Sequence, residues 1–222
     1  MITPQVTTEE AFSFYNFFSK SVGARVYHWI DEEKMDRTEA ADGILIRDDK
    51  NPNAKGLWEV ARSFNMEKNN LLTLNQRIEK GLQWIVVVAP ENLSVYPGWK
   101  SWVQKISAIP VRILLASADD ESFVHFPYVF PTISYVEKHG TFVNYSGRVQ
   151  EIYPAPVKMI EEAKTLQEIL NLFAAHWGIS YALSEGDLEG ALKRLPPYKD
   201  FQYQAITPIK KIGRRRIYES YD

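Results

Sequence analysis

The chain has 222 residues, of which 45% are hydrophobic and 24% are charged, and it contains no cysteine. These proportions are typical of a globular protein and exclude a disordered tail, a collagen-like repeat and a coiled-coil rod. Without cysteine the chain has no disulfide scaffold, thiolate zinc site, cysteine-ligated iron–sulfur cluster or cysteine nucleophile, and its net charge of −2 creates no overall attraction to nucleic acid or an anionic membrane.

The first third of the chain is predicted to be mainly helical. Thr7-x-x-Glu10 has the spacing of a capping box, and apolar residues follow at helical intervals, so we expect a helix over 8–21 that ends at Gly23. Residues 25–30 (RVYHWI) have the composition of a strand. The next segments are predicted to be a charged helix or loop over 31–42, a short strand or buried segment over 43–46 and a turn-rich stretch over 48–53. Two helices are predicted to follow, over 56–64 and 71–80.

Three apolar runs in the middle of the chain predict a parallel sheet. Residues 84–89 (WIVVVA) lie between Gly81 and Pro90 and have the pattern of a strand buried on both faces. The same pattern returns in 112–117 (RILLAS) and 128–133 (YVFPTI), with a candidate helix over 99–106 between the first two runs. This alternation predicts an α/β fold with parallel strands and right-handed crossovers.

The remainder of the chain is predicted to be extended and then helical. Residues 141–152 favour β structure, are broken by Ser146-Gly147 and predict a hairpin-like or irregular extended segment. Thr165-x-x-Glu168 is a second capping box, and the helix it begins ends at Gly178. A short helix over 187–195 is stopped by two prolines, so we expect one α/β domain over 1–180 and a C-terminal helix with a basic extension over 181–222.

The C-terminal end of the chain is basic. The last residues carry a local charge of about +3, from Lys210, Lys211, Arg214, Arg215 and Arg216 against Glu219 and Asp222. Such a tail can dock on an acidic partner or remain a solvated terminus, and the sequence leaves both open.

The sequence also predicts the cellular location. No apolar run approaches the roughly 20 residues of a spanning helix. The segment MITPQVTTEEAF lacks the basic start and apolar core of a signal peptide, so we expect a cytoplasmic protein without membrane insertion.

Common catalytic patterns are missing from the sequence. It has no glycine-rich dinucleotide fingerprint, phosphate loop, nucleophile elbow or H-E-x-x-H motif. Its histidines do not have ligand spacing, so we interpret them as surface or core residues; they are His28, His125, His139 and His176. Neighbouring acids could form acid–base pairs, but such acids more often cap helices or lie in loops; they are Glu32-Glu33, Asp48-Asp49 and Asp119-Asp120.

Residues 137–150 (EKHGTFVNYSGRVQ), here called the signature segment, are the most informative part of the sequence. The segment has two glycines suited to unusual backbone angles, several side chains that can bond backbone groups, and Arg148, whose guanidinium has five donors for a carboxylate or phosphate. One interpretation is a polar turn that locks a loop onto the sheet. The other is a ligand-facing loop with Arg148 as an anion clamp, and chemistry alone does not separate them.

The signature segment is similar to the E-x-x-G-T-x-x-N-x-x-G-R-x-Q motif of the molybdopterin oxidoreductase superfamily. Within that superfamily it most resembles the large peripheral-arm subunit of NADH–quinone oxidoreductase (complex I). The matching positions are Glu137, Gly140, Thr141, Asn144, Gly147, Arg148 and Gln150. Segments 42–53, 84–92, 129–132 and 165–178 follow in the family's order, so the resemblance covers about residues 40–180. It implies a parallel-sheet, three-layer α/β domain, the middle region of the family, with a helical and irregular C-terminal tail.

The departures from the family pattern bear on function. Tyr145-Ser146 replaces the usual Thr-Glu, and the aromatic run 126–128 replaces an acidic residue. With no cysteine and 222 residues, the chain lacks the family's cluster modules and the length of its full cofactor cradle. The resemblance therefore implies that this chain carries no cofactor or metal, while iron–sulfur clusters and FMN belong to partner subunits.

Two functions remain from the resemblance. The first is a non-catalytic structural or assembly subunit of a complex I-like NADH–quinone oxidoreductase, packed against other peripheral-arm subunits beside the cytoplasmic membrane. The second is a pterin- or nucleotide-binding module of a split molybdenum or tungsten oxidoreductase, such as a formate dehydrogenase. In that case Thr141, Asn144 and Arg148 would contact the pterin or phosphate. An unrelated hydrolase or transferase ranks last, because no nucleophile and base can be named.

Overall fold

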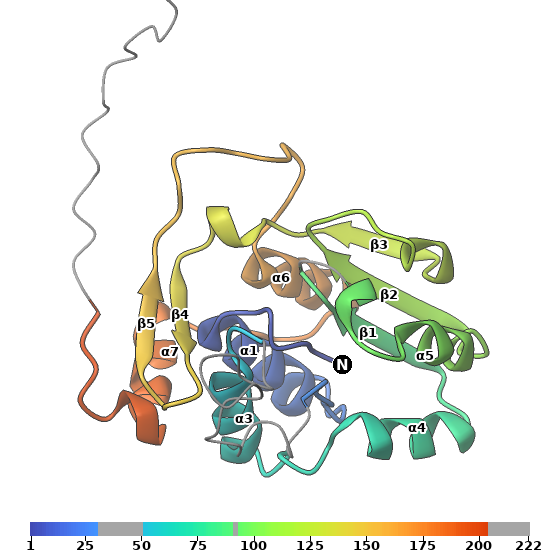
Figure 1. Ribbon diagram of the computed structural model, residues 1–222, viewed down its shortest axis with the longest axis horizontal. Helices are drawn as coiled ribbons and strands as arrows, with labels where there is room; N and C mark the ends of the chain where they lie inside the picture. Colours follow the sequence, from blue (N-terminus) through green and yellow to red (C-terminus); the bar gives the residue numbers. More distant parts are fainter. Residues whose placement is uncertain (31–50, 91–92, 204–222) are drawn as a thin grey trace, which may run out of the picture.

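A parallel three-stranded sheet is the centre of the computed structural model, which describes residues 1–30, 51–90 and 93–203 (Figure 1). The strands lie in the order β1-β2-β3 and all run parallel. They are β1 (Trp84–Val88), β2 (Val111–Ala116) and β3 (Tyr128–Pro131). The parallel α/β class predicted from the apolar runs is therefore confirmed.

The helices of the described residues follow the predicted apolar spacing closely. The α-helices are α1 (Thr8–Tyr15), α3 (Ala54–Ser63), α4 (Leu71–Glu79), α5 (Trp99–Ile106), α6 (Leu166–Trp177) and α7 (Glu185–Leu192). α1 continues as a π-helix over Asn16–Ser21, and short 3-10 turns lie at Leu93–Val95, Phe123–His125, Tyr135–Glu137 and Pro196–Tyr198. Both predicted capping boxes are present, at Thr7 and Thr165, and Gly178 ends α6 with a φ of 64°. None of these helices is long and apolar enough to cross a membrane.

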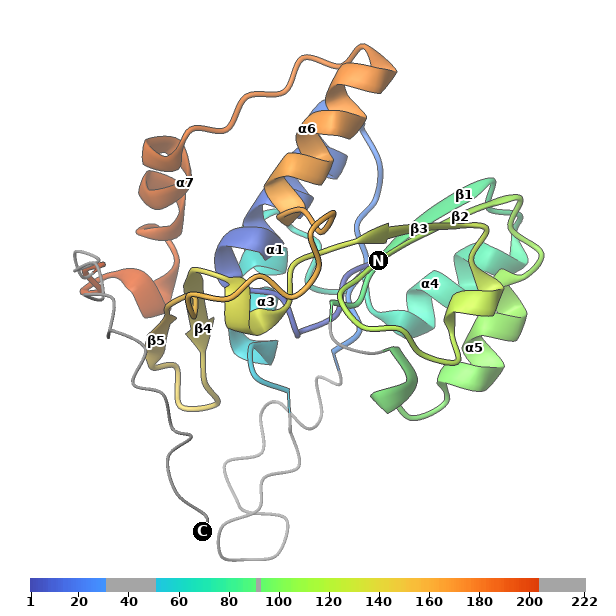
Figure 2. The same ribbon diagram turned by 90° about the horizontal axis from the view of Figure 1, so that it is seen from above.

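Side chains of the sheet alternate between two hydrophobic cores. Val86, Ile113 and Leu115 face the first core, which contains residues of α1, α3 and α6. Val87 and Leu114 face the second core, where α4 and α5 pack with several aromatic side chains. In Figure 2 these two sets of helices lie on opposite sides of the sheet. The first core also includes Leu192, Leu195 and Tyr198, so the described part of the predicted C-terminal region packs against α1.

The predicted strand over 25–30 is wrong in its extent. Within that segment only His28 forms a β-bridge, and its partner is Ile2. Ile2 also bridges Val88, so the first residues of the chain lie between β1 and the segment around His28. The sequence shows the β-favouring composition of the segment but not this short contact at the edge of the sheet. The predictions for 31–50 and for the basic tail at 210–222 lie outside the described residues.

An antiparallel hairpin stands apart from the parallel sheet. Its strands are β4 (Gly140–Val143) and β5 (Val149–Ile152), as the sequence predicted for 141–152. Both views place α1 and α3 between this hairpin and the parallel sheet (Figures 1 and 2). The signature segment therefore lies on the helices and not on the sheet.

Candidate functional site

The signature segment begins in a tight turn before β4. Glu137 completes a capping box with Ser134, whose backbone N–H donates to Glu137 Oε2 at 3.0 Å. Glu137 Oε1 accepts a second bond, from the backbone N–H of Met159 at 2.9 Å. The Glu137 carboxylate therefore connects the turn before β4 with the segment that follows β5.

Asn144 organises the turn between β4 and β5. Its Oδ1 accepts hydrogen bonds from the backbone N–H groups of Ser146 and Arg148, both at 3.0 Å. Gly147 has a φ of 81°, a left-handed conformation that favours glycine. The guanidinium of Arg148 is exposed and meets no carboxylate among the described residues. Gln150 is exposed on β5.

Thr141 connects the hairpin to the first turn of α1. Its backbone N–H donates to Glu9 Oε2 at 2.7 Å, and its hydroxyl donates to Glu9 Oε1 at 2.8 Å. The Tyr203 hydroxyl donates to Glu9 Oε1 at 2.8 Å, and the Tyr198 hydroxyl bonds the Thr141 hydroxyl. These four residues, Glu9, Thr141, Tyr198 and Tyr203, form what we call the Glu9 network.

Burial sets the acid–base properties of the Glu9 network. It raises the pKa of Glu9 above the usual glutamate value, although the bonds from Thr141 and Tyr203 act in the opposite direction. Burial, followed by the nearby Glu9 charge, also raises the pKa of both tyrosines. A carboxyl group whose oxygens are already bonded inside the fold holds the hairpin on the helix.

Gly140 permits the close approach of hairpin and helix. A Cβ atom at this position would lie 2.7 Å from Glu9 Oε2 and 2.9 Å from two carbons of Thr7. Next to it, the buried Lys138 ammonium lies 3.0 Å from Glu10 Oε1. The glycine and threonine of the signature segment therefore serve a tight junction between two parts of the fold.

Asn53 completes this junction from the start of α3. Its Nδ2 donates to the Val6 carbonyl at 2.8 Å, and its Oδ1 accepts from the Val143 backbone N–H at 2.8 Å. Sequence reasoning missed Asn53 and Glu9 as partners of the signature segment. The only available signal was that Glu9 stands beside the capping box and Asn53 in the N-P-N turn.

The three residues predicted for a pterin or phosphate do not face one cavity. Thr141 bonds Glu9 at the helix, whereas Asn144 and Arg148 lie in the turn at the other end of β4. The Asn144 carbonyl oxygen is already occupied by backbone donors of its own turn. Of the three, Arg148 alone presents an exposed charged group for an external anion.

Two of the histidines and one of the paired acids make structural contacts, whereas Glu32-Glu33 and Asp48-Asp49 lie outside the described residues. His28 is buried and its Nε2 lies 2.9 Å from the Glu67 carbonyl oxygen, while His139 Nε2 lies 3.0 Å from Glu151 Oε1. Asp120 accepts hydrogen bonds from the backbone of Ser94 and Ser122. Across the ranges that the structure describes, no group of three or more histidine or carboxylate side chains is placed to hold a metal.

One part of the sheet face that borders the first core is not covered by the residues that the structure describes. The exposed or half-buried apolar side chains there come from β1, β2, β3 and the end of α6, and we call them the open sheet face: Trp84, Val111, Ile113, Tyr128, Phe130 and Trp177. A hollow of about 380 Å³ lies beside Trp84 and Val111, and the described residues that line it are all apolar. Tyr128 is 54% exposed and Val111 is 40% exposed, so α6 covers this face only in part.

Sequence comparison does not add an assignment. No protein-family model matches the chain, and no curated protein matches it in sequence.

Proposed function

We propose that this chain is a structural subunit of a multisubunit oxidoreductase similar to NADH–quinone oxidoreductase, and that it carries no redox centre itself. Its domain would correspond to the three-layer middle region of the large peripheral-arm subunit in that complex. Iron–sulfur clusters and FMN would belong to partner subunits, on the cytoplasmic side of the membrane. The proposal rests on the resemblance of the signature segment and on the surface that the fold leaves uncovered.

The open sheet face is the observation that carries the proposal. Contiguous apolar surface of this kind is characteristic of protein interfaces, because its burial removes apolar area from water. β3 is also an edge strand, and residues 128–130 have no backbone partner beyond β2 within the described ranges. A partner subunit could cover the apolar side chains and pair with this edge at the same time.

The signature segment supports the same function. Gly140, Thr141 and Asn144 make contacts inside the chain, where they fix the hairpin on α1 and shape its turn. This use of the motif fits a domain that keeps its fold and needs no ligand in the hairpin.

Affinity purification of the tagged full chain from its own cells tests the proposal. We expect co-purification of subunits that carry FMN and iron–sulfur clusters, and loss of these subunits when Val111→Lys and Tyr128→Lys are combined. The matched control is Leu72→Lys on α4, because Leu72 is 67% exposed and lies outside the open sheet face. A chain that purifies without redox subunits, or partners retained by the double variant, would contradict the proposal.

A pterin- or nucleotide-binding module is the second candidate. The observation in its favour is the exposed Arg148 guanidinium, which suits a phosphate. Analysis of the purified assembly for molybdenum, tungsten and fluorescent pterin distinguishes the two functions. Pterin that is bound by the wild type and lost in Arg148→Gln would favour this second function. An assembly that contains no molybdenum, tungsten or pterin would exclude it.

A further inference from the structure

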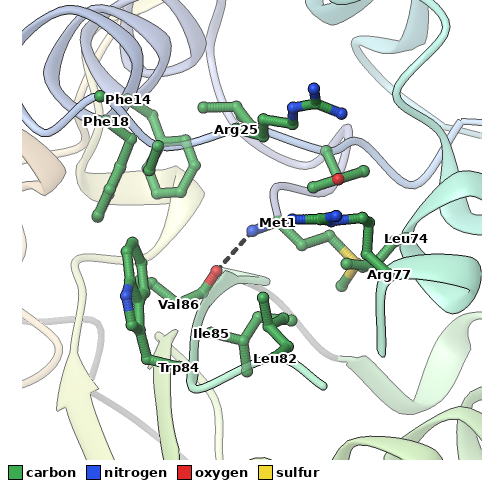
Figure 3. Close-up of a pocket in the computed structure, with 14 residues that line it drawn as sticks. Met1, Phe14, Phe18, Arg25, Leu74, Arg77, Leu82, Trp84, Ile85 and Val86 are labelled. Carbon is green, nitrogen blue, oxygen red and sulfur yellow. Dashed lines mark hydrogen bonds between the residues drawn. The ribbon is translucent and has the colours of Figure 1, made fainter. Parts of the chain in front are cut away.

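A second cavity lies on the other side of Trp84, between the end of the first helix, α4 and the start of β1 (Figure 3). Its volume is about 320 Å³, at the lower end of the range for ligand clefts. Apolar side chains make up most of its wall, and they are Phe14, Phe18, Leu74, Leu82, Trp84 and Ile85. Figure 3 shows Phe14, Phe18 and Trp84 together on one side of the space.

Two arginines line the solvent side of this cavity. Figure 3 shows Arg77 across from Trp84 and Arg25 beside Phe14, and both arginines are exposed, so their guanidinium groups lie on the solvent side of the cavity. Neither guanidinium has an ion pair with a carboxylate in the part of the chain that the structure describes. Among the residues that the structure describes, the lining contains no acidic side chain that could neutralise the two charges.

The amino group of Met1 also reaches the cavity but adds little charge. It donates a hydrogen bond to the Val86 carbonyl oxygen at 2.6 Å (Figure 3). Burial lowers its pKa to about 5, so this amine is mostly uncharged at neutral pH. The positive potential of the cavity therefore comes from Arg25 and Arg77.

We propose that this cavity binds an amphipathic organic anion, namely a carboxylate attached to an alkyl chain. The chain would lie against Phe14, Phe18 and Trp84, where its burial removes apolar area from water. The carboxylate would accept charge-assisted hydrogen bonds from Arg25 and Arg77, whose planar donor groups match its geometry. This inference does not depend on the proposed role in an oxidoreductase complex.

The wall chemistry favours this ligand class over simpler ones. Inorganic phosphate could bond the guanidinium groups but would leave the aromatic wall unfilled. A neutral alcohol of the same length could fill the wall but would gain no ion pair from the arginines. Only a ligand with both parts uses both sides of the cavity.

Isothermal titration calorimetry on the full chain tests the proposal with decanoate and its neutral match, decanol. We expect decanoate to bind at one site, about tenfold more tightly than decanol. Arg25→Gln and Arg77→Gln should each weaken decanoate binding by roughly threefold to tenfold and leave decanol binding unchanged. Added salt should weaken the binding of decanoate alone.

Two control variants separate this cavity from other surfaces. Arg194→Gln removes an exposed arginine outside the cavity and should leave decanoate binding unchanged. The double variant Val111→Lys and Tyr128→Lys alters the open sheet face and should also have no effect. Equal affinities for decanoate and decanol, no binding below about 1 mM, or unchanged binding in both cavity arginine variants would overturn the proposal.

Discussion

Gly140 shows how one residue of the signature segment controls the junction between the hairpin and α1. Its φ of 155° is strained for other residues, and an added Cβ would overlap Glu9 and Thr7. We expect Gly140→Ala to lower the free energy of unfolding by roughly 2–4 kcal/mol, measured by urea denaturation. Gly147→Ala is the control: its φ is 81°, but no atom lies within 4 Å of the added Cβ, so a loss of only about 1–2 kcal/mol is expected. Equal losses would show that close packing at Gly140 is unimportant.

Glu9 should make stability depend on pH, and the sign follows from its burial. Its pKa is raised above 4.5 in the folded chain, chiefly by desolvation, so the folded state holds the proton more tightly than the unfolded state. This contribution to stability is fully present below pH 4.5 and is lost as the pH rises through the raised pKa.

The variant Glu9→Gln cannot ionise and should lose no stability in this way. We therefore expect the difference in free energy of unfolding, wild type minus variant, to decrease between pH 4.5 and neutral pH. Urea denaturation at several pH values measures it. A difference that stays constant or increases over this range would contradict the assignment of a raised pKa to Glu9.

At the scale of single elements, the capping box of α6 provides a direct test. The Thr165 hydroxyl accepts a bond from the Glu168 backbone N–H at 3.2 Å, and the Glu168 carboxylate accepts from the Thr165 backbone at 2.7 Å. Thr165→Ala should cost about 1 kcal/mol of unfolding free energy. Bonds from Thr165 also hold the pKa of Glu168 below its usual value, so an NMR titration of the variant should show a higher pKa. The control is Glu162→Ala, which removes an exposed carboxylate and should change neither the unfolding free energy nor the pKa of Glu168. If the control changes both by the same amount, the effects come from general surface charge and not from the capping box.

The elements of this fold could largely be predicted from local sequence, because their signals are local. Capping boxes and apolar spacing located the helices, and the continuous run 84–89 located β1. The strand predicted for 25–30 was wrong in its extent because the contact of this segment with Ile2 depends on how the first residues of the chain lie against the sheet. The Glu9–Thr141 contact was missed for the same reason, since it joins residues 132 positions apart.

For the whole molecule, the sequence indicated buried strands but not how much of the sheet the helices cover. Trp84 stands in a run that looks fully buried and Val111 directly precedes another, yet both are exposed beside the end of α6. Coverage of a sheet depends on where a helix is placed in space, and the apolar spacing of a single segment does not contain that information. The surface on which the proposed function rests was therefore visible only in the assembled fold.

The open sheet face should make the isolated chain self-associate. An apolar surface beside an edge strand favours contacts between copies when no partner covers it, and residues 128–130 of β3 have no backbone partner beyond β2 in the described ranges. Sedimentation velocity over a concentration series should show reversible association, and the double variant Val111→Lys and Tyr128→Lys should raise its dissociation constant at least about tenfold. Because both side chains are 40% or more exposed, the variant should keep the unfolding free energy of the wild type within about 1 kcal/mol. Leu72→Lys, a change of the same type on α4, should associate like the wild type; if it disrupts association equally, the open sheet face is not the surface through which copies meet.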